Sequence, residues 1–283
     1  MLRIAIQSKG RLYEESMALL EEAGIKIPGG KRTLLVPARN FPVEVLFLRD
    51  DDIPESVASG VAEVGIVGLN EVMEKRCPVG ILKKLGFGKC RLSLAIPQDI
   101  DYQDRNWFSG KKIATSYPGI LSDYLHKNGI VSDIHVITGS VEIAPGIRLA
   151  DAIFDIVSSG STLVSNRLKE VETVVESEAV LIGTDSISPE KRGILDELLF
   201  RFDSVQAADD KKYILMNVPQ KKLNDVLSVL PGIKSPTVMP LADKEWCSVH
   251  TFSVEKCFWE IINRLKMAGA EGILVLDIEK MIL

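Results

Sequence analysis

A short apolar strand that runs into a turn of small residues and then into a helix occurs more than once in this chain. Leu2 to Gln7 predict such a strand, and Ser8 to Arg11 turn the chain into a helix over Leu12 to Ala23. The pattern starts again with a strand over Lys112 to Thr115 and a helix over Ile120 to Asn128. Strands that alternate with helices in this way are typical of α/β proteins with largely parallel sheets.

Two such α/β lobes are expected. A polar connection over Pro97 to Gly110 follows the predicted strand Cys90 to Ile96, and we place a crossing between lobes there. The extended segment Val174 to Ile182 can carry the chain back. We therefore expect lobe I at residues 1–96, completed by about 180–210, and lobe II at 97–179. Two lobes joined by crossing strands form a ligand cleft at their interface.

The last part of the chain, residues 211–283, predicts a separate unit with the order βαββαβ. Its helices are expected over Leu223 to Leu230 and along the apolar stripe that ends at Leu265. Its strands are expected over Tyr213 to Val218, Pro236 to Leu241, Trp246 to Phe252 and Gly272 to Leu276. This order is that of the ferredoxin-like split unit, which does not by itself assign a role.

One stretch, Ala150 to Thr162, has the pattern of a phosphate site. An apolar strand carrying Asp155 breaks into a turn before a helix-compatible segment, Leu163 to Val171. The small and hydroxyl-bearing residues of that turn are Ser158, Ser159, Gly160, Ser161 and Thr162. Converging backbone N–H groups at a helix start favour an anion, whereas a carboxylate accepts hydrogen bonds from sugar hydroxyls. The combination of this turn with the carboxylate of Asp155 therefore indicates a site for a sugar phosphate. The alternative is an ordinary surface loop with a helix cap.

Other polar residues have two interpretations. The acidic run Asp50 to Asp52 follows a strand, and it either binds a cation or caps the helix beginning near Pro54, which we favour. Tyr117 either lines a nucleotide pocket or anchors a turn before its proline. Asp151 lies deeper in its strand than Asp155, and we expect it to be structural.

Charge and cysteine spacing exclude several classes of protein. A formal net charge of −5 argues against a general nucleic-acid or membrane-surface binder, since both need a basic field. The four cysteines contain no Cys-x-x-Cys pair, so neither a zinc site nor a disulfide framework is indicated. No secretion signal is recognisable in the first ten residues and no apolar run approaches the ~20 residues that cross a bilayer. We expect a cytoplasmic protein.

Seven segments, in order along the chain, resemble the ATP phosphoribosyltransferase family of histidine biosynthesis. They are Ile4 to Leu12, Arg49 to Pro54, Gly65 to Gly68, Cys90 to Ala95, Ile113 to Pro118, Gly139 to Glu142 and Ala150 to Leu163. Ser235 to Ala242 and Gly272 to Leu276 resemble the tail of the family's long form. One departure is Gln7-Ser8-Lys9-Gly10-Arg11-Leu12, because many members begin with Pro-Lys-Gly-Arg-Leu.

The resemblance implies a fold and a reaction. The fold is a two-lobe core like the type II periplasmic binding proteins, followed by a C-terminal ferredoxin-like domain. The reaction transfers the phosphoribosyl group of phosphoribosyl pyrophosphate to N1 of ATP and releases pyrophosphate, with inversion at the anomeric carbon. Mg²⁺ is expected to accompany the pyrophosphate, held through substrate phosphates. The family also implies a homo-oligomer, a dimer or a hexamer.

The resemblance also implies residue roles. Ser158 to Thr162 would hold the 5′-phosphate, and Asp155 with Glu142 would engage the ribose hydroxyls. Lys9, Gly10, Arg11, Arg49 and Tyr117 would contact ATP or phosphates, with Arg11 also assisting catalysis; for the three cations, the alternative is an ordinary solvated side chain. Adenine N1 is itself a nucleophile, so positioning and electrostatics should dominate catalysis. Thr237, Leu241 and Ala242 would contact histidine as a feedback inhibitor.

Two other classes of protein remain to be distinguished. One is a non-catalytic two-lobe solute-binding protein with an appended sensor domain, and the other is a regulatory subunit that binds amino acids without chemistry. The sugar-phosphate loop and the lack of a secretion signal favour the enzyme.

Overall fold

The computed structural model describes residues 1–28, 33–230, 236–254 and 258–282, which form two compact units. The units are Met1–Leu199 and Phe200–Leu283, and the boundary between them falls within helix α6 (Pro189–Ala208). Each unit is described below on its own.

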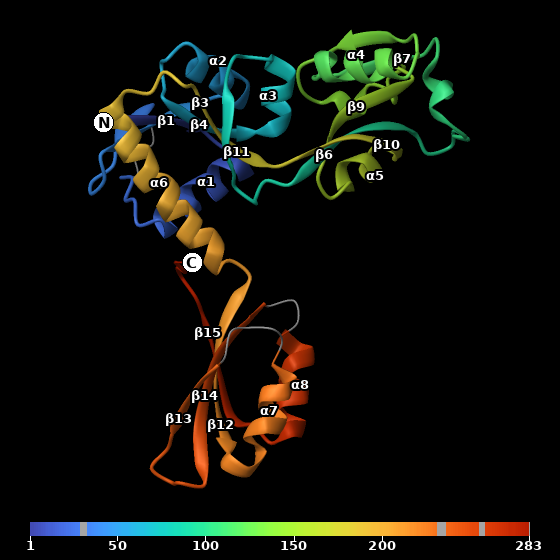
Figure 1. Cartoon of the computed structure of the whole chain (residues 1–283). Coiled ribbons are helices and arrows are strands. Elements are labelled where there is room, and N and C mark those ends of the chain that lie inside the picture. Colours follow the sequence, from blue (N-terminus) through green and yellow to red (C-terminus); the bar gives the residue numbers. More distant parts are fainter. Residues whose placement is uncertain (29–32, 231–235, 255–257, 283) are drawn as a thin grey trace. The chain divides into compact units, whose positions relative to one another are not determined.

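The first unit contains two sheets, and the first of them has the strand order β2-β3-β1-β4-β11-β5 (Figure 1). Its strands are β1 (Leu2–Gln7), β2 (Leu35–Pro37), β3 (Val43–Leu48), β4 (Val64–Gly68), β5 (Gly80–Lys84) and β11 (Ala179–Gly183), and its helices are α1 (Arg11–Glu22), α2 (Ile53–Ala58) and α3 (Leu69–Lys75). β1 runs parallel to β3 and β4, whereas β11 returns antiparallel to β4 and β5. Side chains from α2, β4 and β11 form its core, including Ile53, Val67 and Val180.

The second sheet of this unit has the order β10-β6-β9-β7-β8. Its strands are β6 (Cys90–Pro97), β7 (Lys112–Thr115), β8 (Asp133–Val136), β9 (Ala152–Val157) and β10 (Leu168–Ser177), and its helices are α4 (Pro118–Lys127) and α5 (Ser161–Ser165). β7 is parallel to β8 and β9, so the turns that follow β7 and β9 emerge at the same edge. Phe108 and Phe154 are fully buried in its core.

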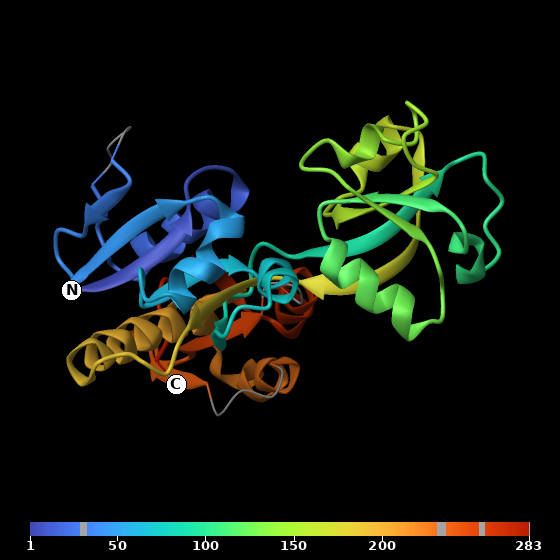
Figure 2. The same cartoon turned by 90° about the horizontal axis from the view of Figure 1, so that it is seen from above.

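The chain crosses between the two sheets twice. It leaves the first sheet after β5 and enters β6, and it returns from β10 to β11 through the single residue Glu178. Figures 1 and 2 show the long strands of this crossing between the two sheets. The predicted two-lobe α/β architecture is therefore confirmed. We call the part around the first sheet lobe I and the part around the second sheet lobe II.

The second unit follows the predicted βαββαβ order. It contains β12 (Lys211–Pro219), α7 (Leu223–Val229), β13 (Thr237–Pro240), β14 (Trp246–Val254), α8 (Phe258–Ala268) and β15 (Glu271–Asp277). The sheet order is β13-β14-β12-β15 with every neighbouring pair antiparallel, which is the ferredoxin-like arrangement. Alternating residues Ile214, Met216 and Val218 of β12 form its core with α7 and α8. Ser235, at the start of a family-like segment, lies outside the described residues.

The predicted helix from Leu163 to Val171 is wrong beyond its first turn. Helix α5 ends at Ser165, and β10 begins at Leu168 and pairs antiparallel with β6 along its length. The local pattern from Leu168 onward suits a helix, but these residues form a strand because β10 pairs with β6 at the edge of the sheet and buries Leu168. The sequence interpretation also missed α3 and β5.

Among the helices within the ranges that the structure describes, none is both long enough and apolar enough to cross a bilayer.

Candidate functional site

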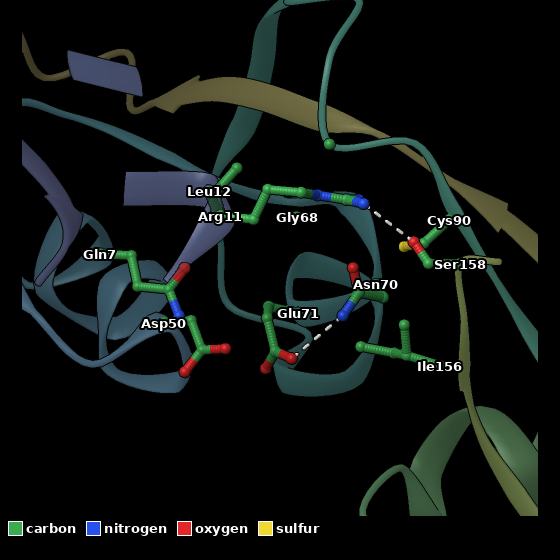
Figure 3. Close-up of a pocket in the computed structure, with 11 residues that line it drawn as sticks. Gln7, Arg11, Leu12, Asp50, Gly68, Asn70, Glu71, Cys90, Ile156 and Ser158 are labelled. Carbon is green, nitrogen blue, oxygen red and sulfur yellow. Dashed lines mark hydrogen bonds between the residues drawn. The ribbon is translucent and has the colours of Figure 1, made fainter. Parts of the chain in front are cut away.

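A cavity of about 220 Å³ lies between the two lobes of the first unit. Lobe I contributes Gln7, Arg11, Leu12, Asp50, Gly68, Asn70 and Glu71, lobe II contributes Cys90, Ile156 and Ser158, and Gly88 comes from a crossing segment (Figure 3). The cavity thus brings the first predicted segment of lobe I to the predicted phosphate loop of lobe II. Residues from both lobes are needed to form it.

Arg11 joins the two lobes at this cavity. It is the first residue of α1 and follows Gly10, whose φ of 92° lies in the region that favours glycine. Its Nη1 donates to Ser158 Oγ at 3.0 Å, and its Nη2 donates to the Lys89 carbonyl at 3.3 Å. The side chain is more than half exposed, and its Nε lies 3.8 Å from Glu15 Oε1. A guanidinium in this position can bind a phosphate.

The backbone of the loop is held by a second arginine. Arg91 donates from Nη1 to the Ser158 carbonyl at 3.1 Å and forms two hydrogen bonds of 2.5 Å with the Glu170 carboxylate. These bonds, with help from Ser93 and Thr173, lower the pKa of Glu170 to about 2. Glu170 therefore stays ionised near neutral pH, and Arg91 stays fixed beneath the loop.

The loop from Ser158 to Thr162 is exposed and rich in hydroxyl groups. Gly160 has a φ of 80° and precedes the first residue of α5. The Ser159 and Ser161 hydroxyl oxygens lie 3.0 Å apart, and the Thr162 side chain is exposed. Such a loop offers several donors to one anion.

Asp155 precedes the loop in β9 and does not itself line the cavity. Its Oδ1 accepts a 2.8 Å hydrogen bond from the Ile156 N–H. Burial is the main reason that the pKa of Asp155 is raised to about 6; the nearby charge of Glu142 contributes to this rise, and the hydrogen bond from the Ile156 N–H opposes it. Asp151 accepts from the Lys112 N–H at 2.9 Å, as expected of a structural acid.

The remaining predicted nucleotide residues of lobe I lie outside the cavity lining. Lys9, Gly10 and Arg49 are all exposed, and Arg49 Nε lies 3.7 Å from Asp51 Oδ1. Asp50 to Asp52 form a short 3₁₀ helix before α2. Asp52 stands at the N-cap position of α2 but makes no side-chain hydrogen bond to it, so the favoured capping interpretation is right about the position and wrong about the hydrogen bond. The 3₁₀ turn directs Asp50 into the cavity instead.

Tyr117 is buried at the start of α4, and its hydroxyl binds residues of lobe I. The hydroxyl donates to Glu71 Oε1 at 2.8 Å and accepts from Asn70 Nδ2 at 3.2 Å. Asn70 also donates to Glu71, at 3.1 Å, and accepts from the Ser177 hydroxyl at 2.8 Å.

Burial is the main reason that the pKa of Glu71 is raised to about 6. The charges of Asp50 and Asp51 contribute to this rise, and the hydrogen bond from Tyr117 opposes it. Burial also raises the pKa of Tyr117. This placement favours the anchoring interpretation of Tyr117.

Asn70 and Glu71 were missed by the sequence interpretation. Both follow the carboxyl end of β4, a buried strand bounded by glycines, and ligands of α/β sheets bind at the carboxyl ends of strands. That position was the signal available in the sequence.

Thr237, Leu241 and Ala242 lie in the second unit, around β13 and the turn that follows it. Thr237 and Ala242 are exposed, and the Leu241 N–H donates to the Trp246 carbonyl at 3.2 Å. Among the residues described, no group of three or more His, Cys, Asp or Glu side chains is placed to hold a metal ion.

The chain matches two family models. Residues 49–204 match the model described as HisG: ATP phosphoribosyltransferase, and residues 208–280 match HisG, C-terminal domain. It is 69% identical over 283 residues to proteins named ATP phosphoribosyltransferase from Bacteroides fragilis and Phocaeicola vulgatus, with 100% of both chains covered. A protein of the same name from Cytophaga hutchinsonii is 57% identical, covering 99% of this chain and 98% of its own length.

Solved structures agree with this similarity. A chain of the ATP phosphoribosyl transferase (HisG:HisZ) complex from Thermotoga maritima aligns with a TM-score of 0.61 and 27% identity, covering 71% of this chain and 98% of its own. The substrate binding protein of an amino acid ABC transporter aligns with a TM-score of 0.50 and 10% identity over 73% of this chain and 93% of its own. The latter likeness concerns the two-lobe fold alone.

Proposed function

The chain belongs to the ATP phosphoribosyltransferase family, and we propose that phosphoribosyl pyrophosphate and ATP meet in the cavity between its two lobes. The enzyme transfers the phosphoribosyl group to N1 of ATP, the first step of histidine biosynthesis. The observation that carries the proposed location is the contact between Arg11 of lobe I and Ser158 of lobe II, since it brings a cation to the phosphate loop.

The loop and the carboxylates of lobe II would bind the sugar phosphate. Ser158 to Thr162 would donate hydroxyl and backbone hydrogen bonds to the 5′-phosphate. Asp155, with Glu142 beside it, would accept from the ribose hydroxyls. A carboxylate accepts such bonds fully only when it is ionised, and the pKa of Asp155 near 6 allows this at neutral pH.

Lys9, Gly10, Arg11 and Arg49 of lobe I would bind the phosphates of ATP or of the leaving pyrophosphate. Lys9, Arg11 and Arg49 are exposed and charged, and the glycine lets the backbone approach a ligand. We propose a less direct role for Tyr117. Its hydroxyl holds Glu71 on the cavity wall, so Tyr117 would affect ATP binding through that residue.

The reaction needs little acid–base help. The N1 lone pair of adenine forms a bond to C1′ of the ribose while the bond from C1′ to the pyrophosphate oxygen breaks, and that electron pair leaves with pyrophosphate. The chain's task is to align N1 with C1′ and to stabilise the charge that develops on pyrophosphate. Among the described residues that line the cavity, Arg11 is the one cation, and we assign the second task to it.

Mg²⁺ fits this site as an ion carried largely by substrate phosphates. It favours oxygen ligands and commonly binds through one or two carboxylates together with phosphates and water. Asp50 in the cavity wall offers one such carboxylate, and no described cluster offers three ligands. When bound, Mg²⁺ would neutralise charge on the leaving pyrophosphate.

The second unit is the family's C-terminal domain, which implies feedback regulation by histidine. We propose that Thr237, Leu241 and Ala242 contact histidine. A homo-oligomer, a dimer or a hexamer, and a cytoplasmic location are proposed on the same family grounds. The bounds of lobe I (1–96, completed by about 180–210), of lobe II (97–179) and of the C-terminal domain (211–283) also stay predictions.

The deciding experiment follows the absorbance of the N1-substituted adenine product. Purified full-length protein is incubated with ATP, phosphoribosyl pyrophosphate and Mg²⁺, and the control omits phosphoribosyl pyrophosphate. Product that requires both substrates is expected. Folded protein that binds phosphoribosyl pyrophosphate and forms no product would instead support the solute-binding alternative.

A further inference from the structure

A carboxylate from lobe I caps the start of helix α4 in lobe II. Both oxygens of Glu74 in α3 accept hydrogen bonds from the first turn of α4, Oε1 from the Gly119 N–H at 2.8 Å and Oε2 from the Ile120 N–H at 2.9 Å. The N-cap residue of α4 is Tyr117, and it provides no side-chain cap of its own. Two backbone N–H groups at the start of this helix in lobe II therefore find their hydrogen-bond acceptors in lobe I.

The approach of the two helices leaves little room for a side chain at position 119. A Cβ atom added to Gly119 would lie 3.0 Å from Glu74 Oε1 and 3.3 Å from both the carboxyl carbon and Oε2. Since the backbone of Gly119 lies in the helix, its importance comes from this contact and not from an unusual φ angle.

Two further contacts join the same helices. Arg76, at the end of α3, donates from Nη2 to Asp123 Oδ2 at 2.7 Å and to the Gly119 carbonyl at 3.1 Å. Tyr117 donates to Glu71, one turn before Glu74 on α3. We call these contacts, together with the two from Glu74, the α3–α4 latch; of its residues, Glu71 also lines the cavity.

Helix α4 starts at the same edge of the lobe II sheet as the phosphate loop, so the latch acts close to that loop. α4 follows β7, and the phosphate loop follows β9, which is the parallel neighbour of β7. The two turns emerge at the same sheet edge, where α/β sheets bind ligands. The phosphate loop is left exposed for substrate, whereas the start of α4 is occupied by the chain's own carboxylate.

We propose that Glu74 is a positioning residue for phosphoribosyl transfer: by capping α4, it sets the separation of the lobes at which Arg11 reaches the phosphate loop. Glu74 touches no reacting atom and acts through α4. The inference rests on the proposed function, because it assigns the reaction to the cavity that the two lobes form.

Two substitutions test the latch from opposite sides. Glu74→Ala removes both acceptors. Gly119→Ala places a Cβ against the carboxylate and leaves Glu74 in the chain. Alanine is by itself the better helix former, so Gly119→Ala should make the start of α4 more stable if only local helix propensity matters. If the latch matters, the same change loosens it.

We expect both variants to lower kcat/KM for phosphoribosyl pyrophosphate about tenfold to a hundredfold, since small displacements of bound reactants have effects of that size. Hydrogen exchange of the amides at the start of α4 should become faster in both. In the double variant the second substitution should add no further loss, because both act on one contact. Glu55→Ala, which removes an exposed carboxylate from α2 of the same lobe, is the matched control and should behave as the parent protein.

The outcomes separate this inference from the proposed function. An active parent protein together with parent-like kcat/KM in Glu74→Ala and Gly119→Ala would overturn the positioning role and leave the function intact. A parent protein without activity would overturn the function. Unchanged exchange at α4 in both variants would overturn the latch itself, whatever the activity. If Glu74→Ala fails to fold, Gly119→Ala decides alone.

Discussion

Arg11 Nη1 and Ser158 Oγ lie 3.0 Å apart, although 147 positions separate the two residues in the chain. The arginine begins the first helix of lobe I and the serine begins the phosphate loop of lobe II. Because Ser158 Oγ is the acceptor, a phosphate bound at the loop would compete for the same N–H group. Substrate binding would then replace a contact within the protein by a stronger charge-assisted one.

Replacing Arg11 should therefore affect the reaction and leave the fold unchanged. We expect Arg11→Ala to lower kcat about a hundredfold, the size of effect seen when a single donor to developing charge is removed. Steady-state kinetics with both substrates measures it. Arg39→Ala, which removes an exposed cation from the same lobe, should stay within about twofold of the parent. Equal losses in the two variants would contradict the role of Arg11.

Asp155 in β9 and Asp151 just before it should differ in importance. Asp155→Asn should lose far more activity than Asp151→Asn, because only Asp155 is assigned to the ribose, whereas Asp151 binds the Lys112 N–H. Activity of the parent should rise with pH through about 6 as Asp155 ionises. The comparison of kcat/KM between pH 5 and pH 8 tests both points. Equal losses would mean that the sugar-binding acid is assigned wrongly.

Glu71 should make the folded protein more stable in mild acid. Its pKa is raised from 4.5 to about 6, so the folded state takes up a proton more readily than the unfolded state. This contribution is fully present below about pH 4.5 and is lost as pH rises through about 6, with an amplitude of about 2 kcal/mol.

Urea unfolding at pH 5 and pH 7 measures this effect. The parent should lose more unfolding free energy between the two values than Glu71→Gln, which cannot ionise. A parent and variant with the same pH dependence would show that Glu71 titrates normally.

Regulation by histidine should depend on the second unit alone. Thr237→Ala should weaken inhibition about tenfold, since a hydrogen bond to a ligand contributes on the order of 1–2 kcal/mol. The uninhibited kcat should not change, because β13 lies outside the unit that holds the cavity. Inhibition curves for Thr237→Ala and for Lys244→Ala, an exposed residue of the following turn, make the test. Unchanged inhibition in Thr237→Ala would remove that residue from the histidine site.

Local sequence patterns predicted most of the strands and the order of the C-terminal unit. The strands Leu2–Gln7 and Lys112–Thr115 have the expected bounds, because an apolar run between turn residues encodes a buried strand without long-range help. The end of the helix after the phosphate loop was not predictable in this way. Leu168 to Val171 suit a helix locally, and only pairing with β6 makes them a strand.

The candidate site also has one part that the sequence predicted and one part that only the structure revealed. By itself the sequence determined that a carboxylate, hydroxyls and a glycine follow one another from Asp155 to Thr162, since neighbours in the chain are neighbours in the loop. Only the tertiary structure decided that Arg11 meets this loop, that Tyr117 binds Glu71 and that Glu74 caps α4. Those contacts join lobes whose residues are far apart in sequence, and they depend on the two crossings that place one sheet beside the other.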